Sequence, residues 1–391
     1  MSKNINVPKL RFKEFSEEWE EKELEKIFNI FQGFAFSSSD ITNEGVRWLK
    51  IADVGIQRMK YDTPCFLPKI FKEKYSKFLL NKNDYVLALT RPILNGMLKI
   101  AKIDDIYNGS LLNQRVGKII TRESLDFIYY FLQQTNLINK IDSFILGSEP
   151  PNLSINQIKF IKASIPLKKE QEKIASFLTS VDTKIEQLIK KDEFLQQYKK
   201  GMIQKIFNEE IRFKADDGNE FSEWEEKKLS DILDYIQPTK YLVKDTEYNN
   251  SFKIPVLTAG KTFILGYTDE TDGIYKDNLP VIIFDDFTTA NRFVNFQFKV
   301  KSSAIKILVP KENNNIKFIY EAMQMIKYEV GGHERHWISK FSFLDIFVPC
   351  VEEQNKIANF LSSIDDKIEK NQKILEKTKE FKKSLLQQMF V

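Results

Sequence analysis

The chain has 391 residues, of which 42% are hydrophobic and 13% aromatic, so it can bury substantial cores and is not disordered. This length predicts two domains of middling size plus connecting elements. The 59 basic and 55 acidic residues give a net charge of only +4, so bulk charge does not indicate a nucleic-acid partner. Any nucleic-acid-binding face has to be a local patch.

The two cysteines, Cys65 and Cys350, lie far apart and share no C-x-x-C spacing, which argues against a disulfide framework and against a zinc site. The first ten residues lack an apolar signal core, and no stretch approaches the ~20 apolar residues that span a bilayer. We therefore expect a protein of the reducing cytoplasm with no membrane partner.

Two stretches of the sequence recur and organise the chain. LRFK at 10–13 and EFSEEWEEKEL at 14–24 return as IRFK at 211–214 and EFSEWEEKKL at 220–229. Residues 166–207 pair without a gap with residues 349–390, an offset of 183, and 19 of the 42 positions are identical. The intervening segments, about 25–150 and 230–335, show no comparable similarity to each other. This pattern predicts one fold that occurs twice and carries different loops.

In chain order, the apolar runs Tyr85 to Leu89 and Val281 to Phe284 predict strands within the two variable segments. The repeated stretch that follows each segment has apolar residues at alternating steps of three and four, the pattern of a coiled-coil seam. A helix of ~40 residues rises ~60 Å, more than a small domain needs for its own core, so we interpret each as a spacer. The predicted seam consists chiefly of Ile174, Leu178, Val181, Ile185 and Leu188 in the first helix and of Ile357, Leu361, Ile364 and Ile368 in the second.

The predicted fold is mixed α+β, with two α/β domains separated by two long antiparallel coiled-coil helices in a pseudo-twofold internal repeat. Chain order requires the second helix to return along the first if the two seams pack together. The predicted boundaries are 1–166 and 209–349 for the domains and 167–208 and 350–391 for the helices. The alternative is that each amphipathic helix covers only its own domain.

The residues shared by the long repeats resemble the conserved regions of the specificity subunits of Type I restriction-modification systems. They are Pro166, Glu170-Gln171, Ile174-Ala175, Phe177-Leu178 and Asp182, repeated as Pro349, Glu353-Gln354, Ile357-Ala358, Phe360-Leu361 and Asp365. The resemblance extends over almost the whole chain. It implies two target recognition domains, each of which reads half of a bipartite, asymmetric site in double-stranded DNA.

The resemblance also implies partners and cofactors that lie outside this chain. The conserved helices are expected to bind two modification subunits, which methylate adenine with S-adenosylmethionine, and restriction subunits, which use ATP and Mg, are expected to join that assembly. For the chain itself we expect no catalytic residue, no metal and no cofactor. What the residues themselves show is a duplicated frame with two divergent modules, which suits the reading of two half-sites at a fixed separation.

Candidate DNA contacts are polar side chains in loops after the predicted strands, in a further polar cluster at 113–115, and just before the conserved element of each half, because such side chains hydrogen-bond base edges or phosphates. In the first segment they are Thr90, Arg91, Asn95, Lys99, Asn113, Gln114, Arg115, Ser148 and Asn152. In the second segment they are Thr288, Thr289, Asn291, Arg292, His333, Arg335 and His336, with Lys261 and Tyr267 as weaker candidates. The alternative for any single one is a solvated turn residue.

Motifs that carry chemistry are incomplete in this sequence. SEPPN at 148–152 is similar to the proline pair of amino-methyltransferases but lacks the aromatic residue that stacks the target base. Gly-Lys-Thr at 260–262 has Pro255 where a phosphate-binding loop needs its first glycine. His333 and His336 have no evident third metal ligand, and Asp285-Asp286 have no partnered lysine or acid motif of a nuclease. Two other hypotheses remain open: the recognition part of a fused methyltransferase-nuclease, and a coiled-coil adaptor without a DNA role.

Overall fold

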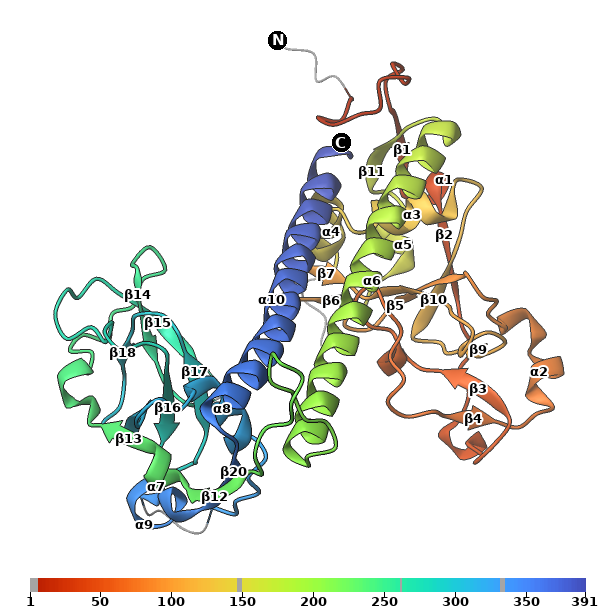
Figure 1. The fold of residues 1–391 in the computed structure, drawn as a ribbon. Coiled ribbons are helices and arrows are strands. Elements are labelled where there is room, and N and C mark those ends of the chain that lie inside the picture. The colour runs from red at the N-terminus through yellow and green to blue at the C-terminus, as the bar shows by residue number, and fades with distance from the viewer. Residues whose placement is uncertain (1–5, 146–149, 261, 331–334) are drawn as a thin grey trace. The chain divides into compact units, whose positions relative to one another are not determined.

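The computed structural model describes residues 6–145, 150–260, 262–330 and 335–391. Contacts divide the chain into two compact units, unit 1 with Met1–Ile189 and Lys373–Val391, and unit 2 with Lys190–Gln372. Each unit therefore contains one variable segment together with part of both long helices, α6 (Lys168–Phe207) and α10 (Val351–Gln388). Figure 1 shows these elements along the chain.

Unit 1 is built on an antiparallel four-stranded sheet in which β5 lies between β10 and β8. All four residues of β5 are buried, as expected for a strand with apolar packing on both faces. The strands of this sheet, in spatial order, are β2 (Asn29–Gln32), β10 (Val116–Ile120), β5 (Tyr85–Ala88) and β8 (Ile100–Lys102). The smaller strands are β4 (Phe66–Leu67), β3 (Val46–Leu49) and β9 (Leu111–Leu112) in one sheet, and β6 (Ile93–Leu94) and β7 (Met97–Leu98) in a hairpin.

Short helices lie on both faces of the unit 1 sheet, and all but one of them pack in the core that also contains α6. The exception is the helix that begins at Phe71, which packs in the core on the other face. The most buried is α3, whose aromatic residues pack in the same core cluster as Leu178 of α6 and Leu385 of α10. Its first turn is capped by the hydroxyl of Ser124, which accepts from the amide of Phe127. The helices are α1 (Leu24–Ile27), α2 (Phe71–Lys74), α3 (Leu125–Phe131), α4 (Thr135–Ser143) and α5 (Ile155–Ile158).

Unit 2 repeats this plan around the strand β16, which is buried at its first four positions. The sheet, in spatial order, consists of β13 (Leu233–Ile236), β19 (Ile305–Pro310), β16 (Val281–Asp285) and β17 (Asn291–Val294). A second sheet contains β15 (Ile264–Thr268), β14 (Ile254–Leu257) and β18 (Lys299–Val300). The short helices are α7 (Leu229–Ile232), α8 (Ile316–Met323) and α9 (His336–Ser339).

The two units share one strand order although their sequences diverge. The spatial order of the strands is the same in both sheets: β2, β10, β5 and β8 of unit 1 correspond in turn to β13, β19, β16 and β17 of unit 2. The helix α3 corresponds to α8. Each unit also has a two-stranded ladder that closes the frame, β1 (Glu20–Glu23) with β11 (Lys162–Ile165) and β12 (Glu225–Lys228) with β20 (Asp345–Val348). The prediction of two mixed α/β domains in an internal repeat is confirmed.

A buried glutamine fixes the start of each long helix to its unit. The Gln171 side chain accepts from the amide of Ser124 at 3.1 Å and donates to the carbonyl of Pro166 at 2.9 Å. Gln354 does the same in unit 2, accepting from Asn315 at 2.8 Å and donating to Pro349 at 3.0 Å. In each unit one glutamine side chain thus binds the amide of the residue that caps the short helix, α3 or α8, and the carbonyl of the proline before the long helix.

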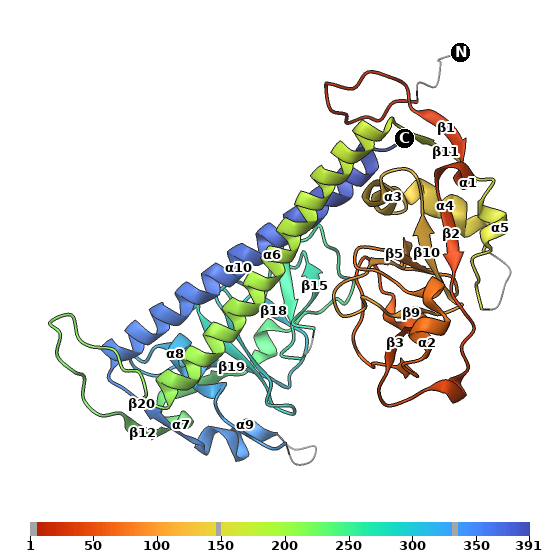
Figure 2. The same ribbon diagram turned by 90° about the vertical axis from the view of Figure 1, so that its right-hand side faces the viewer.

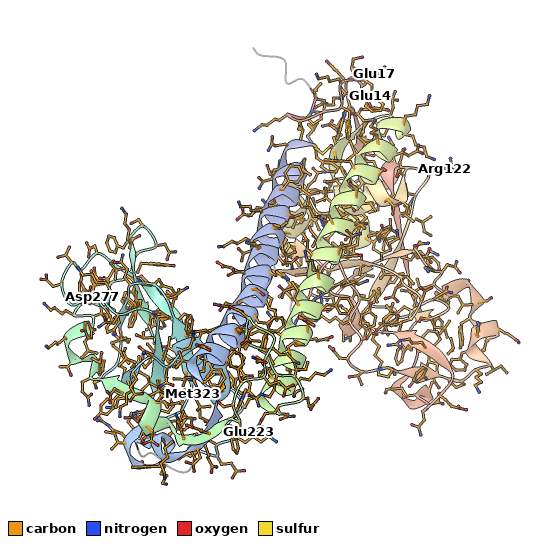
Figure 3. The ribbon with its side chains drawn as sticks, in the orientation of Figure 1. Glu14, Glu17, Arg122, Glu223, Asp277 and Met323 are labelled. Carbon is orange, nitrogen blue, oxygen red and sulfur yellow. The ribbon has the colours of Figure 1, made fainter. Side chains whose placement is uncertain are left out.

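A neighbouring glutamate ties the N-terminal segment of each repeat to the same helix start. Arg11 donates to both carboxylate oxygens of Glu170 at 2.8 and 2.7 Å, a bidentate pair that raises the pKa of the Arg11 guanidinium. Arg212 binds Glu353 in the same way at 3.3 and 2.8 Å. Figure 3 labels Glu14 and Glu17 in this segment of unit 1 and Glu223 in that of unit 2. The repeated RFK and EQ motifs are therefore two sides of one contact.

Within each unit, part of α6 lies beside part of α10, as both views show (Figures 1 and 2). In unit 2 Asp192 accepts from Gln372 at 3.3 Å and Lys199 pairs with Asp365 at 2.7 Å, so the helices run antiparallel there. Although burial works against its charge, Glu321 and Asp365 raise the pKa of Lys199.

The corresponding lysine of α10 makes the corresponding pair in unit 1, where Lys382 approaches Asp182 at 2.7 Å and donates to Gln57 at 2.9 Å. The two lysines that interrupt the apolar seams are thus matched by two aspartates of the opposite helix. Of the predicted seam residues, Ile185 is half-buried and the others, Ile174, Leu178, Val181, Leu188, Ile357, Leu361, Ile364 and Ile368, are buried.

No helix among the described residues is long and apolar enough to cross a membrane.

Leu178→Asp and Leu361→Asp test the packing of the long helices. Both leucines are fully buried, so a carboxylate at either position is expected to lower the free energy of unfolding by about 3–5 kcal/mol. Gln187→Asp, at an exposed position of α6, is the control and is expected to change stability by less than about 0.5 kcal/mol. Thermal unfolding of the three variants measures this, and wild-type stability of both leucine variants would contradict the packing.

Candidate nucleic-acid interface

The structure brings part of the first candidate set together where β5 ends. Thr90, Gln114, Arg115 and Asn152 line one hollow of about 770 Å³ in unit 1. The hydroxyl of Thr90 donates to the Asn152 side-chain oxygen at 2.7 Å, although the two residues are 62 positions apart in sequence. The hollow is open at the surface and is lined by amide, hydroxyl and guanidinium groups, which are the groups that bind base edges and phosphates.

Backbone hydrogen bonds hold the two sides of this hollow in place. The amide of Arg91 donates to the carbonyl of Pro151 and the amide of Leu153 to that of Leu89, both at 2.7 Å. Arg91 has a φ of 46°, a left-handed conformation that turns the chain sharply after the strand. The segment before the conserved helix is therefore attached to the end of β5, and its polar residues face the same opening.

Lys99 lies beside this turn, because its amide donates to the carbonyl of Pro92, the residue after Arg91, at 2.7 Å. We call Lys99, Lys60 and Arg91 the Lys99 cluster. Burial lowers the pKa of Lys99, and the nearby charges of Lys60 and Arg91 lower it further. Cations that repel one another in the free protein gain stability when an anion is bound between them. This cluster is suited to a phosphate.

Two other candidates of unit 1 have different surroundings. Asn113 is half-buried, and its side-chain oxygen accepts from the amide of Arg115 at 2.8 Å, so it shapes the turn. Asn95 is exposed at the tip of the β6–β7 hairpin, where Asn95 and Gly96 both have positive φ, as a tight two-residue turn requires. Gly96 lines a separate hollow of about 360 Å³ with Asp182 and Lys382 of the long helices. The structure does not place this hairpin tip in the hollow beside Thr90.

Four candidates of unit 2 lie on the β16–β17 turn and in the first two residues of β17. Asp285 caps this turn, since its side chain accepts from the amides of Phe287 and Thr288 at 3.0 and 2.9 Å. Thr288 and Arg292 are exposed, while Thr289 and Asn291 are half-buried. Thr288 is therefore exposed on a turn that corresponds in the sheet to the Thr90 turn of unit 1, and Arg292 is exposed in strand β17, which follows this turn.

His336 requires a correction, because its side chain is fully buried and does not face solvent. Its Nδ1 lies 3.1 Å from the hydroxyl of Tyr328, and its ring packs edge-on against the tyrosine ring. A polar residue next to an apolar one, Trp337, gave no sign in the sequence of this interior position. Arg335, directly before it, is exposed.

Tyr267 also differs from expectation, because it lies half-buried within strand β15 and not in a loop. Ser148, Lys261 and His333 lie outside the described residues.

Sequence reasoning missed several polar residues that belong to these surfaces. Gln32 lines the unit 1 hollow and donates to the carbonyl of Gln114 at 2.7 Å. Gln324, the residue that follows α8, donates to the Asn291 side chain at 2.6 Å. Gln32 ends its strand, so a search of both ends of each strand would have found it. Gln324 comes from the end of a helix and carries no comparable signal.

The described residues contain no group of three or more His, Cys, Asp or Glu side chains that could hold a metal ion, and Cys65 and Cys350 form no disulfide.

Comparison with known proteins gives the family. Residues 16–196 and 221–380 match the family described as Type I restriction modification DNA specificity domain. The chain is 50% identical over 141 residues to the specificity subunit of the Type I restriction enzyme EcoR124I/EcoR124II of Escherichia coli, covering 35% of each chain. It is 33% identical over 204 residues to the MjaVIII specificity subunit of Methanocaldococcus jannaschii, covering 51% of this chain and 48% of that one. These matches thus span half or less of each relative.

A solved structure shares the fold over nearly the whole chain. The Type I restriction-modification S subunit from M. genitalium aligns with a TM-score of 0.67 at 16% identity and covers 98% of this chain and 99% of that one.

Lys99→Met tests whether the basic cluster binds phosphate. Removing one phosphate contact is expected to weaken binding of duplex DNA uniformly across sequences and to reduce the slope of log affinity against log salt by about 1. Lys102→Met is the matched control, because Lys102 lies three residues further on and is already paired with Asp126 at 3.2 Å. DNA-binding titrations of both variants and the wild type over a range of salt concentrations are the measurement. Equal slopes of log affinity against log salt for Lys99→Met and the wild type would contradict the phosphate contact.

Proposed function

The chain belongs to the family of Type I restriction-modification DNA specificity subunits, and we propose that it reads a bipartite, asymmetric site in double-stranded DNA, one half with each unit. The observation that carries this proposal is the family match in two separate stretches, 16–196 and 221–380, one for each unit. Two modules with one frame and different loops suit two half-sites of different sequence.

The polar turns at the ends of β5 and β16 support the assignment of the reading surface. In unit 1, Arg115, Gln114 and Asn152 offer the guanidinium and amide groups that pair with guanine and adenine edges. In unit 2, Arg292 is exposed in β17, next to the corresponding turn, and Arg335 is exposed on the segment before the conserved helix. The Lys99 cluster serves phosphate and therefore position, not sequence.

The long helices are proposed to set the distance between the half-sites and to bind two modification subunits. Restriction subunits would join that assembly. Under this proposal catalysis belongs to the partners, with S-adenosylmethionine on the modification subunits and ATP with Mg on the restriction subunits, and the chain contributes recognition alone. A chromosomal or incoming DNA target would place this work in the cytoplasm.

Exchange of one variable segment tests the proposal. We expect that replacing residues 25 to 150 by the corresponding segment of a relative with a known target changes one half of the methylated motif and leaves the other half intact. The reason is that each sheet and its turns belong to one unit only. Methylated-adenine mapping in cells that also express the modification subunits is the measurement.

The reciprocal exchange of residues 230 to 335 is the control and has to change the opposite half. A motif in which both halves change after one exchange would contradict separate reading by the two units.

A further inference from the structure

Three buried polar residues lie at the base of the β16–β17 turn, and we call Asp286, Lys306 and His336 the buried polar trio. Their side chains are at most 1% exposed. Lys306 Nζ lies 3.7 Å from Asp286 Oδ2, its charged partner, and donates to the side-chain oxygen of Gln237 at 3.2 Å. His336 reaches Tyr328 through Nδ1, and its Nε2 has no hydrogen-bond partner among the described residues.

Ladder register identifies the equivalent positions in unit 1. Leu89 donates its amide to Arg115 and accepts from the amide of Leu153, and Asp286 in the same way donates to Ala304 and accepts from His336. Asp286 thus corresponds to Leu89, and His336 to Leu153. The strand pairings Gly117 with Leu87 and Lys306 with Phe284 make Lys306 the equivalent of Gly117.

The equivalent positions of unit 1 are therefore apolar. Leu89 and Leu153 are buried, and a Cβ added to Gly117 would lie 2.2 Å from a methyl carbon of Ile30 and 3.4 Å from one of Leu89, so no side chain fits there. The same backbone hydrogen bond joins two leucines in unit 1 and an aspartate and a histidine in unit 2. The fold therefore does not require charged side chains at these positions.

Burial of an ion pair is a poor source of stability, because desolvation of the charges offsets most or all of their attraction. The trio adds to this cost, since the pair is separated by 3.7 Å and one imidazole nitrogen has no partner. Stability of the core therefore gives no reason for Asp286 and Lys306. Their presence in one unit alone points to something that the two units do differently.

What Asp286 adds is a second, side-chain hydrogen bond between two surface segments that unit 1 joins at this position by the backbone bond alone. Asp286 accepts from the amide of His336 through its carbonyl and from the amide of Trp337 through Oδ1, both at 2.8 Å. Asp285, the preceding residue, caps the turn that presents Thr288. Arg335 directly precedes the two amides that Asp286 binds. One dipeptide thus fixes both the β16–β17 turn and the start of α9.

We propose that Asp286 and Lys306 are positioning residues for specificity. Asp286 orients the turn that carries Thr288 and leads into Arg292 of β17 relative to the segment that carries Arg335. Lys306 holds the Asp286 carboxylate in the orientation that binds the Trp337 amide. This inference rests on the proposed function, because it concerns how unit 2 discriminates its half-site. It assigns no base contact to the trio, which is closed to solvent.

The test is the double variant Asp286→Asn/Lys306→Met in the full chain, assembled with its modification subunits. Asn keeps an oxygen for the Trp337 amide, and Met fills the volume of the lysine stem, so no buried charge is left unpaired. We expect the unit 2 half of the methylated motif to become degenerate at one or more positions, with discrimination lower by about tenfold. The unit 1 half and the thermal stability are expected to stay as in the wild type.

Ile283→Ala is the matched control, because Ile283 is fully buried in the same strand but packs in the core on the other face of the sheet from Phe284 and Asp286. The cavity should lower the melting temperature and leave the motif unchanged. A double variant that keeps full discrimination at both half-sites would overturn the inference, and so would a control that relaxes the motif as much as the double variant does. A wild-type complex that methylates no bipartite motif would instead overturn the proposed function.

Discussion

The buried Glu-Gln pair at the start of each long helix is the interaction on which both halves of this protein depend. Gln171 and Gln354 are at most 1% exposed, and each satisfies a cap amide and the carbonyl of the preceding proline. A substitution at either glutamine leaves buried backbone groups without partners, at a cost of about 1–3 kcal/mol each. The adjacent glutamate binds the arginine of the N-terminal segment, so one helix turn organises three parts of each unit.

Because these contacts fix the start of each long helix, the residues at the ends of the strands can differ between the two units. The corresponding strands β5 and β16 both end in a polar turn, yet the turn of unit 1 is attached by Thr90 and Asn152 and that of unit 2 by Asp286. Core volume and backbone hydrogen bonds are kept while the exposed side chains change. This separation between a repeated frame and variable turns is what sequence-specific reading by two related modules requires.

Periodicity and internal repetition predicted the fold well because they reflect local constraints. The apolar runs Tyr85 to Leu89 and Val281 to Phe284 became β5 and β16, and the seam of steps of three and four became α6 and α10. Lys199 and Lys382, which interrupt the apolar seams, are each matched by an aspartate of the other helix, and the repeat offset of 183 holds for both members of these pairs.

The candidate site was predicted less well because its geometry depends on contacts between distant residues. Nothing local indicates that Asn152 meets Thr90 or that the hairpin tip at Asn95 lies apart from them. His336 was assigned to the surface as a polar residue near other polar residues, yet Tyr328 and Asp286 enclose it. Burial of a histidine is decided by tertiary partners, which composition does not reveal.

The central claim is that two independent readers share one helical frame, and the length of that frame tests it most directly. One heptad inserted after Ile189 in α6 and one after Gln372 in α10 would lengthen both helices while preserving the phase of the seam. Methylated-adenine mapping should then show both half-sequences unchanged and their separation increased by about three base pairs, since seven residues rise ~10 Å. An unchanged separation, or a change in the bases that are read, would contradict the account.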